Sequence, residues 1–166
     1  MKFLIVIFFL FSFSAQALPV QIDNLPDGWM AHALEKSDAA TILFGDAEAL
    51  INLHETNQGS EATIAVYALP QQKGSFGEGT SSWRRALFIP KLEKRIKIFS
   101  ERTYQVDGHW RYVIEYSLNN GTSLRSMAMV TEYKGKLHAF MFELSEKRYI
   151  RLASSVRNLF QKISLN

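Results

Sequence analysis

Three consecutive segments decide the fold: HWRYVIEYSL (residues 109–118), LRSMAMVTEY (residues 124–133) and LHAFMFEL (residues 137–144). In the first segment an apolar or aromatic side chain stands at every second position, which is the period of a strand with two different faces. Asn119-Asn120-Gly121 and Lys134-Gly135 separate the segments, and such residues tolerate the positive φ angles that tight hairpins require. The three segments therefore predict an antiparallel meander.

A helix is predicted directly after the meander. Ser145 is a suitable N-cap residue, because its hydroxyl can accept a hydrogen bond from a free backbone amide. An apolar stripe at helical spacing follows, formed by Tyr149, Leu152, Val156, Leu159, Phe160 and Ile163. Basic residues lie largely off that stripe, namely Arg148, Arg151, Arg157 and Lys162. A helix with one apolar stripe is expected to pack on the sheet.

The segments before the meander give weaker patterns. Residues 18–70 predict irregular strands, with a turn at Leu25–Trp29 and a strand at Ala62–Leu69, a run rich in β-branched and aromatic residues. Ala49–His54 is too short to distinguish a strand from a helix. A glycine-rich loop at Lys73–Ser82 separates this part from the next predicted helix.

A middle helix is predicted from about Trp83 to Ser100. Thr80, Ser81 and Ser82 are suitable caps for its start. Pro90 should either kink the helix or begin a second one, because proline lacks a backbone donor and clashes with the preceding turn. Leu92, Ile96 and Phe99 would then share one helical face.

The order of strands, helix, meander and terminal helix predicts an α+β fold, with a central antiparallel sheet and helices packed on it. The N-terminus adds a further feature: Met1-Lys2, a largely apolar run over residues 3–13, and small residues at Ala15 and Ala17. These are the three parts of a secretory signal peptide, with cleavage expected after Ala17. The run of 11 residues is shorter than the ~20 that a membrane-spanning helix needs. We therefore expect one domain over residues 18–166, in the periplasm or outside the cell.

The chain contains no cysteine. The exported domain consequently has no disulfide bond, no thiolate chemistry and no lipid anchor carried on a cysteine. After cleavage, residues 18–166 hold 18 Lys and Arg against 16 Asp and Glu, a net charge of +2. A charge this small does not indicate a nucleic-acid partner.

The chain resembles the PsbP/Mog1-like superfamily. The resemblance rests on Pro26-Asp27-Gly28-Trp29, the strand at residues 62–69, the middle helix, Val106-Asp107-Gly108 before an aromatic strand, and a final helix after Phe140-Met141-Phe142. It implies an α/β/α sandwich around a central antiparallel sheet. It also implies a protein that binds partners, and it supplies no catalytic set.

Residues typical of catalysis do not form a known motif. The four histidines, His32, His54, His109 and His138, are too far apart in sequence to form a local metal site. The sequence contains neither the Gly-x-Ser-x-Gly motif of serine hydrolases nor the His-Glu-x-x-His motif of zinc hydrolases. We therefore expect no metal, no cofactor and no enzymatic activity.

The region from Arg84 to Arg102 carries seven basic and two acidic residues. One interpretation is the solvated face of an amphipathic helix. The other is a docking surface for an acidic protein partner, with Trp83 as an aromatic anchor. The candidate residues of this surface are Trp83, Arg84, Arg85, Lys91, Lys94 and Arg95.

The sequence thus favours an exported, non-enzymatic protein that binds a protein partner. An immunity-type inhibitor of a toxin is one specific form of this hypothesis. The alternatives are a small hydrolase that acts on envelope material, with carboxylates or histidines brought together by folding, and an envelope assembly or stress factor.

Overall fold

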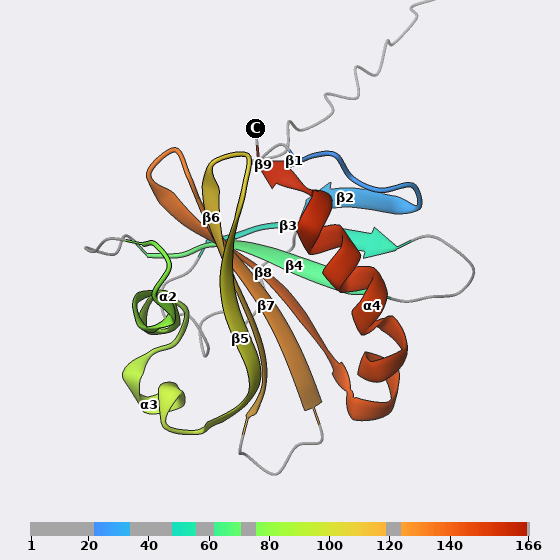
Figure 1. Ribbon diagram of the computed structural model, residues 1–166. Coiled ribbons are helices and arrows are strands. Elements are labelled where there is room, and N and C mark those ends of the chain that lie inside the picture. Colours follow the sequence, from blue (N-terminus) through green and yellow to red (C-terminus); the bar gives the residue numbers. More distant parts are fainter. Residues whose placement is uncertain (1–21, 34–47, 56–61, 71–75, 119–123, 166) are drawn as a thin grey trace, which may run out of the picture.

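A computed structural model describes residues 22–33, 48–55, 62–70, 76–118 and 124–165 (Figure 1). Within these residues seven strands form one antiparallel sheet in the order β2-β3-β4-β8-β7-β6-β5. The strands are β2 (Trp29–Ala33), β3 (Glu48–Glu55), β4 (Thr63–Ala68), β5 (Ile96–Val106), β6 (His109–Leu118), β7 (Leu124–Tyr133) and β8 (Lys136–Ser145). The predicted α+β class with a central antiparallel sheet is confirmed.

The predicted meander corresponds to β6, β7 and β8. Their pairing brings Tyr112 opposite Val130, and Val130 opposite Ala139. Lys134 and Gly135 have φ angles of 50° and 73°, as the turn chemistry predicts for a tight hairpin. The predicted turn at Asn119–Gly121 lies outside the described residues.

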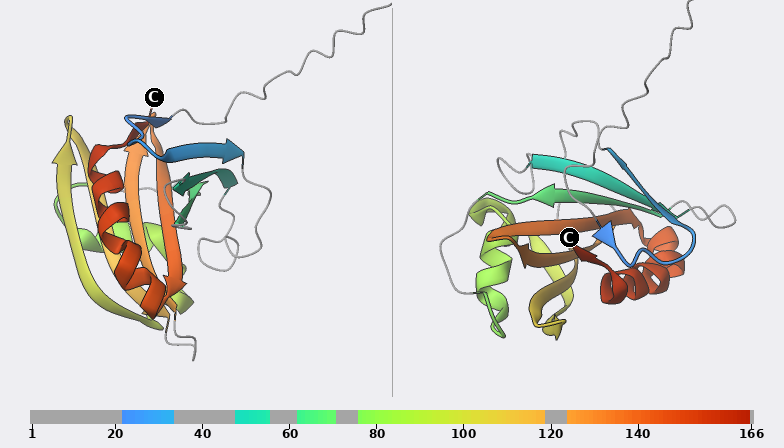
Figure 2. Two further views of the ribbon diagram at one scale, coloured as in Figure 1. Left: turned by 90° about the vertical axis from the view of Figure 1, so that its right-hand side faces the viewer. Right: turned by 90° about the horizontal axis from the view of Figure 1, so that it is seen from above.

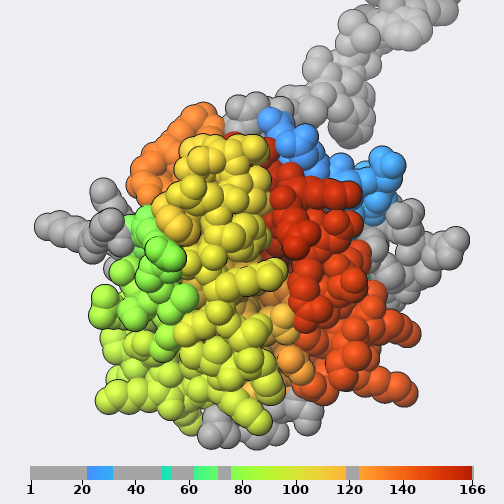
Figure 3. Space-filling model, viewed as in Figure 1, coloured from blue at the N-terminus to red at the C-terminus, as the bar shows by residue number. Residues whose placement is uncertain are grey.

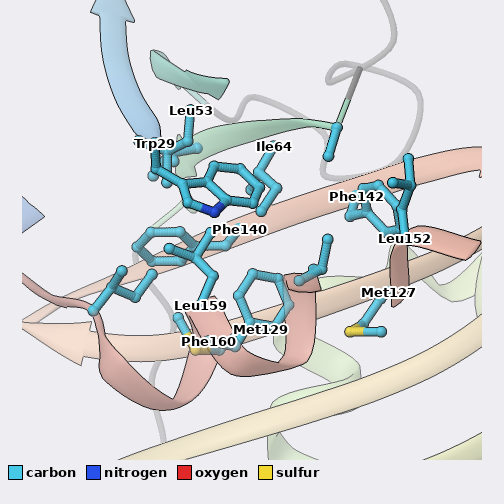
Figure 4. Close-up of a cluster of buried hydrophobic side chains, with 14 of the residues drawn as sticks. Trp29, Leu53, Ile64, Met127, Met129, Phe140, Phe142, Leu152, Leu159 and Phe160 are labelled. Carbon is cyan, nitrogen blue, oxygen red and sulfur yellow. The ribbon is translucent and has the colours of Figure 1, made fainter. Parts of the chain in front are cut away.

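The helix α4 (Glu146–Lys162) covers one face of the sheet (Figure 2). Every residue of the predicted apolar stripe, from Tyr149 to Ile163, is buried. These side chains pack against apolar residues of β2, β3, β4, β7 and β8, with Phe140 and Phe160 facing each other edge to face at 6.3 Å (Figure 4). Ser145 is the N-cap residue, as predicted, although its side chain makes no capping hydrogen bond.

The opposite face carries α2 (Thr80–Leu87) and the short α3 (Pro90–Glu93). A second hydrophobic cluster forms there, in which Trp83, Leu87 and Phe88 pack on Tyr112 and Tyr116 of β6. With α4 on one side and α2 and α3 on the other, the molecule is an α/β/α sandwich (Figure 2).

The prediction of one middle helix from about Trp83 to Ser100 is wrong after Leu87, where α2 ends. The first helix ends at Leu87, Pro90 begins α3, and the chain from Ile96 onward is the strand β5. The physical reason is that Ile96 and Ile98 pack into the second hydrophobic cluster while β5 pairs with β6 along its whole length. The N-cap of α2 is Gly79, not one of the three hydroxyl residues that follow it.

The segments before α2 are also strands, including the one that the sequence left ambiguous. Ala49–His54 falls within β3, and the predicted strand at 62–69 is β4. In the turn before β2, the Trp29 amide donates to the Pro26 carbonyl at 3.1 Å, and Gly28 has a φ angle of 86°. Two short strands, β1 (Ile22–Asp23) and β9 (Ser164–Leu165), pair with each other and bring the ends of the described chain together.

In the part of the chain that the structure describes, no helix has the length and apolar character needed to cross a membrane.

Candidate functional site

The six candidate residues lie on neighbouring elements. Trp83, Arg84 and Arg85 belong to α2, and Lys91, Lys94 and Arg95 lie on α3 and in its connection to β5. These elements form one side of the molecule (Figure 3). The structure separates the six residues into three groups with different roles.

Trp83 is a core residue. Its side chain is 0% exposed, and its ring packs against Phe76 at 4.8 Å and stacks on Tyr112 at 6.3 Å between ring centroids. The indole Nε1 donates a hydrogen bond to the Gly77 carbonyl at 2.9 Å. Trp83 therefore holds α2 on the sheet, contrary to the expectation that it anchors a partner, because no part of the ring reaches the surface.

Arg84 is committed to an internal ion pair. Its Nη2 lies 2.6 Å from Oε1 of Glu101, and its Nε donates to Oε2 at 3.2 Å. Tyr112 donates from its hydroxyl to the same Oε2 at 2.9 Å. Burial, together with the hydrogen bond to Glu101, raises the pKa of Tyr112, so the phenol stays a donor. Arg84 thus fastens α2 to β5.

Arg85, Lys91, Lys94 and Arg95 form what we name the basic surface. All four side chains are exposed. None of the four has an ion-pair partner among the residues that the structure describes. Cations that no protein carboxylate neutralises are available to an acidic partner.

Glu115 is the centre of a charge network that sequence reasoning did not find. It lies in β6 beneath α4 and is only 8% exposed. Arg157 donates to its Oε1 at 2.7 and 3.0 Å, and the Tyr149 hydroxyl donates to Oε2 at 2.9 Å. Arg125 reaches Oε2 at 3.5 Å and also pairs with Glu146 at 2.9 Å. The network joins β6, β7 and α4.

The environment of Glu115 favours its ionised form. Burial alone would raise the pKa of this carboxyl, but the hydrogen bonds from Arg157 and Tyr149 outweigh burial and lower it. Two arginines and two carboxylates balance the charge within the network. Its arrangement fits a positioning role for α4, since every charge in it has an internal partner.

Arg111 binds the C-terminal end of α4. It is 4% exposed, and its two Nη atoms donate to the carbonyls of Phe160 and Ile163, each at 2.5 Å. Tyr104 donates to the Phe160 carbonyl at 3.3 Å. A cation at this end of the helix donates hydrogen bonds to carbonyls that have no partner within the helix, and it interacts favourably with the negative end of the helix dipole.

Two pockets lie near the hairpin turns of the sheet. One of about 80 Å³ is bordered by Arg111, Thr131 and Leu165, and one of about 300 Å³ is bordered by Phe76, Trp83 and Trp110. They share His109 and Glu132. Among the described residues, no three His, Asp or Glu side chains are close enough together to hold a metal ion.

Comparison with known proteins gives a structural match only. No protein-family model matches the sequence, and no curated protein matches it significantly. The solution structure of cyanobacterial PsbP (CyanoP) from Synechocystis sp. superposes with a TM-score of 0.56 at 13% sequence identity, over 92% of this chain and 96% of that chain. The fold is PsbP-like.

A second similar structure is the protein of unknown function PA94 from Pseudomonas aeruginosa, at 12% identity and a TM-score of 0.49, over 89% of this chain and 83% of that chain. The expected resemblance to a PsbP-like fold is confirmed by the first of these two structures.

Proposed function

We propose that this chain is an exported, non-enzymatic protein that binds an acidic protein partner through its basic surface. The observation that carries the proposal is the set of four exposed cations, Arg85, Lys91, Lys94 and Arg95, which lack ion-pair partners among the described residues. Complementary charge brings partners together quickly and fixes their orientation.

The proposed location rests on the N-terminal sequence. Residues 1–17 have the charged start, the apolar run and the small residues of a secretory signal, and we propose cleavage after Ala17. The absence of cysteine from the sequence means that the released domain, residues 18–166, is not held to a membrane as a lipoprotein. Its place of action would then be the periplasm or the exterior.

The proposal includes one more specific form, an immunity-type protein that neutralises a toxin. The size of the exported domain and the lack of a recognisable catalytic motif in the sequence fit this form. A toxin with an acidic surface would be the matching partner. A gene for such a toxin beside the gene for this chain would favour the specific form over the general one.

The experiment expresses the full gene with a C-terminal tag in its own cells and recovers the protein from the envelope fraction. Three versions are compared: the parent, a variant with Arg85, Lys91, Lys94 and Arg95 changed to Glu, and a control with the same charge change on other exposed residues, Lys136, Lys147, Arg151 and Lys162. The mass of the recovered protein gives the site of cleavage.

The proposal expects a protein beginning at Leu18 and one stoichiometric partner that the parent and the control retain and the basic-surface variant loses. Equal retention by all three versions would show that the partner binds elsewhere. Recovery of the uncleaved protein in the cytoplasm would contradict the proposed location, and turnover of a panel of envelope esters or glycans would contradict the non-enzymatic role.

A further inference from the structure

We infer that the outer edge of β5 accepts an extended acidic segment of the partner as an added strand, with two acidic residues four positions apart and an apolar residue midway between them. This inference rests on the proposed function and names how the partner is recognised. It follows from the position of β5, from its register with β6 and from the charges along it.

Among the described residues, the outer edge of β5 has no strand beside it. β5 is the last strand of the sheet order, and among the described strands only β6 pairs with it. The strand spans 11 residues, Ile96–Val106, and lies at the front of the molecule (Figure 1). An unpaired edge of this length presents a row of backbone donors and acceptors that another extended chain can use.

The register with β6 gives the spacing of the expected segment. Lys97 pairs with Ser117, Ser100 with Glu115, and Arg102 with Val113, so the two cations lie opposite positions four residues apart. A register shift between Ile98 and Ser100 brings both cations to the same face of the sheet. A regular strand added on the other edge would meet the two cations with side chains at the same spacing, because residues i, i+2 and i+4 share a face.

The charge on this face of the edge is positive. Lys97 and Arg102 are exposed, and the acidic Glu101 lies on the opposite face, where Arg84 and Tyr112 bind it. A second copy of the same strand would bring like charges together, which disfavours self-association. Opposite charges across two strands stabilise the pair, so an acidic segment is the complementary occupant.

Phe99 provides the apolar contact between the two cations. Its side chain is 41% exposed, and Lys97 and Arg125 lie over its ring at 5.2 and 4.0 Å from the centroid. These contacts hold an exposed aromatic ring in place between the two cations in the sequence of β5. An apolar side chain at the central position of the added strand would cover it.

The experiment titrates the protein, residues 18–166, with a labelled synthetic nine-residue peptide that has Glu at positions 3 and 7, Val at position 5 and Thr elsewhere. Fluorescence polarisation gives the dissociation constant, and amide hydrogen exchange reports the protection of β5. A peptide with Glu at positions 3 and 6 is the spacing control, because its two charges fall on opposite faces of a strand.

Two further peptides test the backbone contacts. One peptide is N-methylated at its odd-numbered amides and the other at its even-numbered amides. In an added strand, one of these two sets of amides faces β5 and the other faces solvent. Strand addition predicts that one methylated peptide binds about tenfold more weakly while the other binds like the parent peptide. A Lys97→Glu, Arg102→Glu variant should also lose about tenfold in affinity, whereas a Lys147→Glu, Arg151→Glu control should not.

The inference is overturned if both methylated peptides bind as tightly as the parent peptide, or if the spacing control binds equally well. In those cases charge alone holds the peptide, and the proposed function stands. Strand addition is also overturned if none of the peptides binds. The proposed function stands in that case if the variant with a reversed basic surface still loses the partner. The inference is also overturned if the β5 amides are protected in the unliganded protein and sedimentation velocity shows a dimer, because a second copy of the chain would then occupy this edge.

Discussion

At the scale of single residues, the charges of this molecule divide into two sets. Arg84, Arg111 and Arg157 are each bound to a carboxylate or to backbone carbonyls and hold elements together. Arg85 and Lys94 are exposed and have no ion pair among the described residues. Only the second kind is available to a partner, and only the structure separates the two kinds.

Glu115 gives a prediction at this scale. Because its pKa is lowered in the folded protein, its ionised form contributes stability above the ordinary pKa of about 4.3, and this contribution is lost as the pH falls through the folded value. We expect Glu115→Gln to cost about 2 kcal/mol of unfolding free energy at pH 7. The difference from the parent should shrink as the pH falls from about 5 to 3.

Urea unfolding at a series of pH values measures this effect. Glu132→Gln is the matched control, because it makes the same chemical change at an exposed residue of β7. A constant difference between the parent and Glu115→Gln at every pH would mean that the loss reflects packing and not the charge of Glu115.

The network around Glu115 was beyond prediction from the sequence. Glu115 and Arg157 are 42 positions apart, and Glu115 stands in a strand whose alternation shows only that it faces away from the aromatic side chains. The one available signal was Arg157, a basic residue placed beside the apolar stripe of α4. Nothing local indicates which carboxylate it meets, because that depends on how α4 crosses the sheet.

At the scale of elements, local patterns succeeded where a segment's own turns and alternation determine its structure. The meander of β6, β7 and β8 was predicted because apolar alternation and hairpin residues agree there. β5 was missed because the register shift at residues 98–100 interrupts its alternation, while Leu92, Ile96 and Phe99 happen to fall at helical spacing. Pairing with β6 decides the structure of that segment.

The hairpin between β5 and β6 gives a prediction at this scale. Gly108 has a φ angle of 79°, and no atom lies within 4 Å of the place where a Cβ would be. Gly108→Ala should therefore destabilise the protein through backbone strain alone, by about 1 kcal/mol. The urea concentration at the midpoint of unfolding measures this loss of stability.

Gly77→Ala is the control for Gly108→Ala. A Cβ at Gly77 also meets no atom within 4 Å, but Gly77 does not have a positive φ angle. Its substitution should be neutral or stabilise the protein by about 0.5 kcal/mol, because alanine restricts the unfolded chain. Equal losses from both variants would contradict the assignment of strain to the hairpin.

At the scale of the whole molecule, the sandwich places helices on both faces of the sheet and leaves the basic surface and the edge strand β5 exposed. Lys94 and Arg95 lead directly into Ile96, the first residue of β5. Two residues of the basic surface therefore lie at the start of this edge, within reach of a partner that pairs with it. The PsbP-like fold supplies the framework, while these surface residues supply the specificity that we propose.

The central claim is that an exported protein meets its partner through the basic surface, and one measurement addresses both parts. A photo-crosslinking amino acid is placed at Lys94 in one strain and at the exposed Arg151 of α4 in another. The account predicts one adduct from position 94, recovered from the periplasm or the medium, and none from position 151. The same adduct from both positions, or an adduct recovered from the cytoplasm, would contradict it.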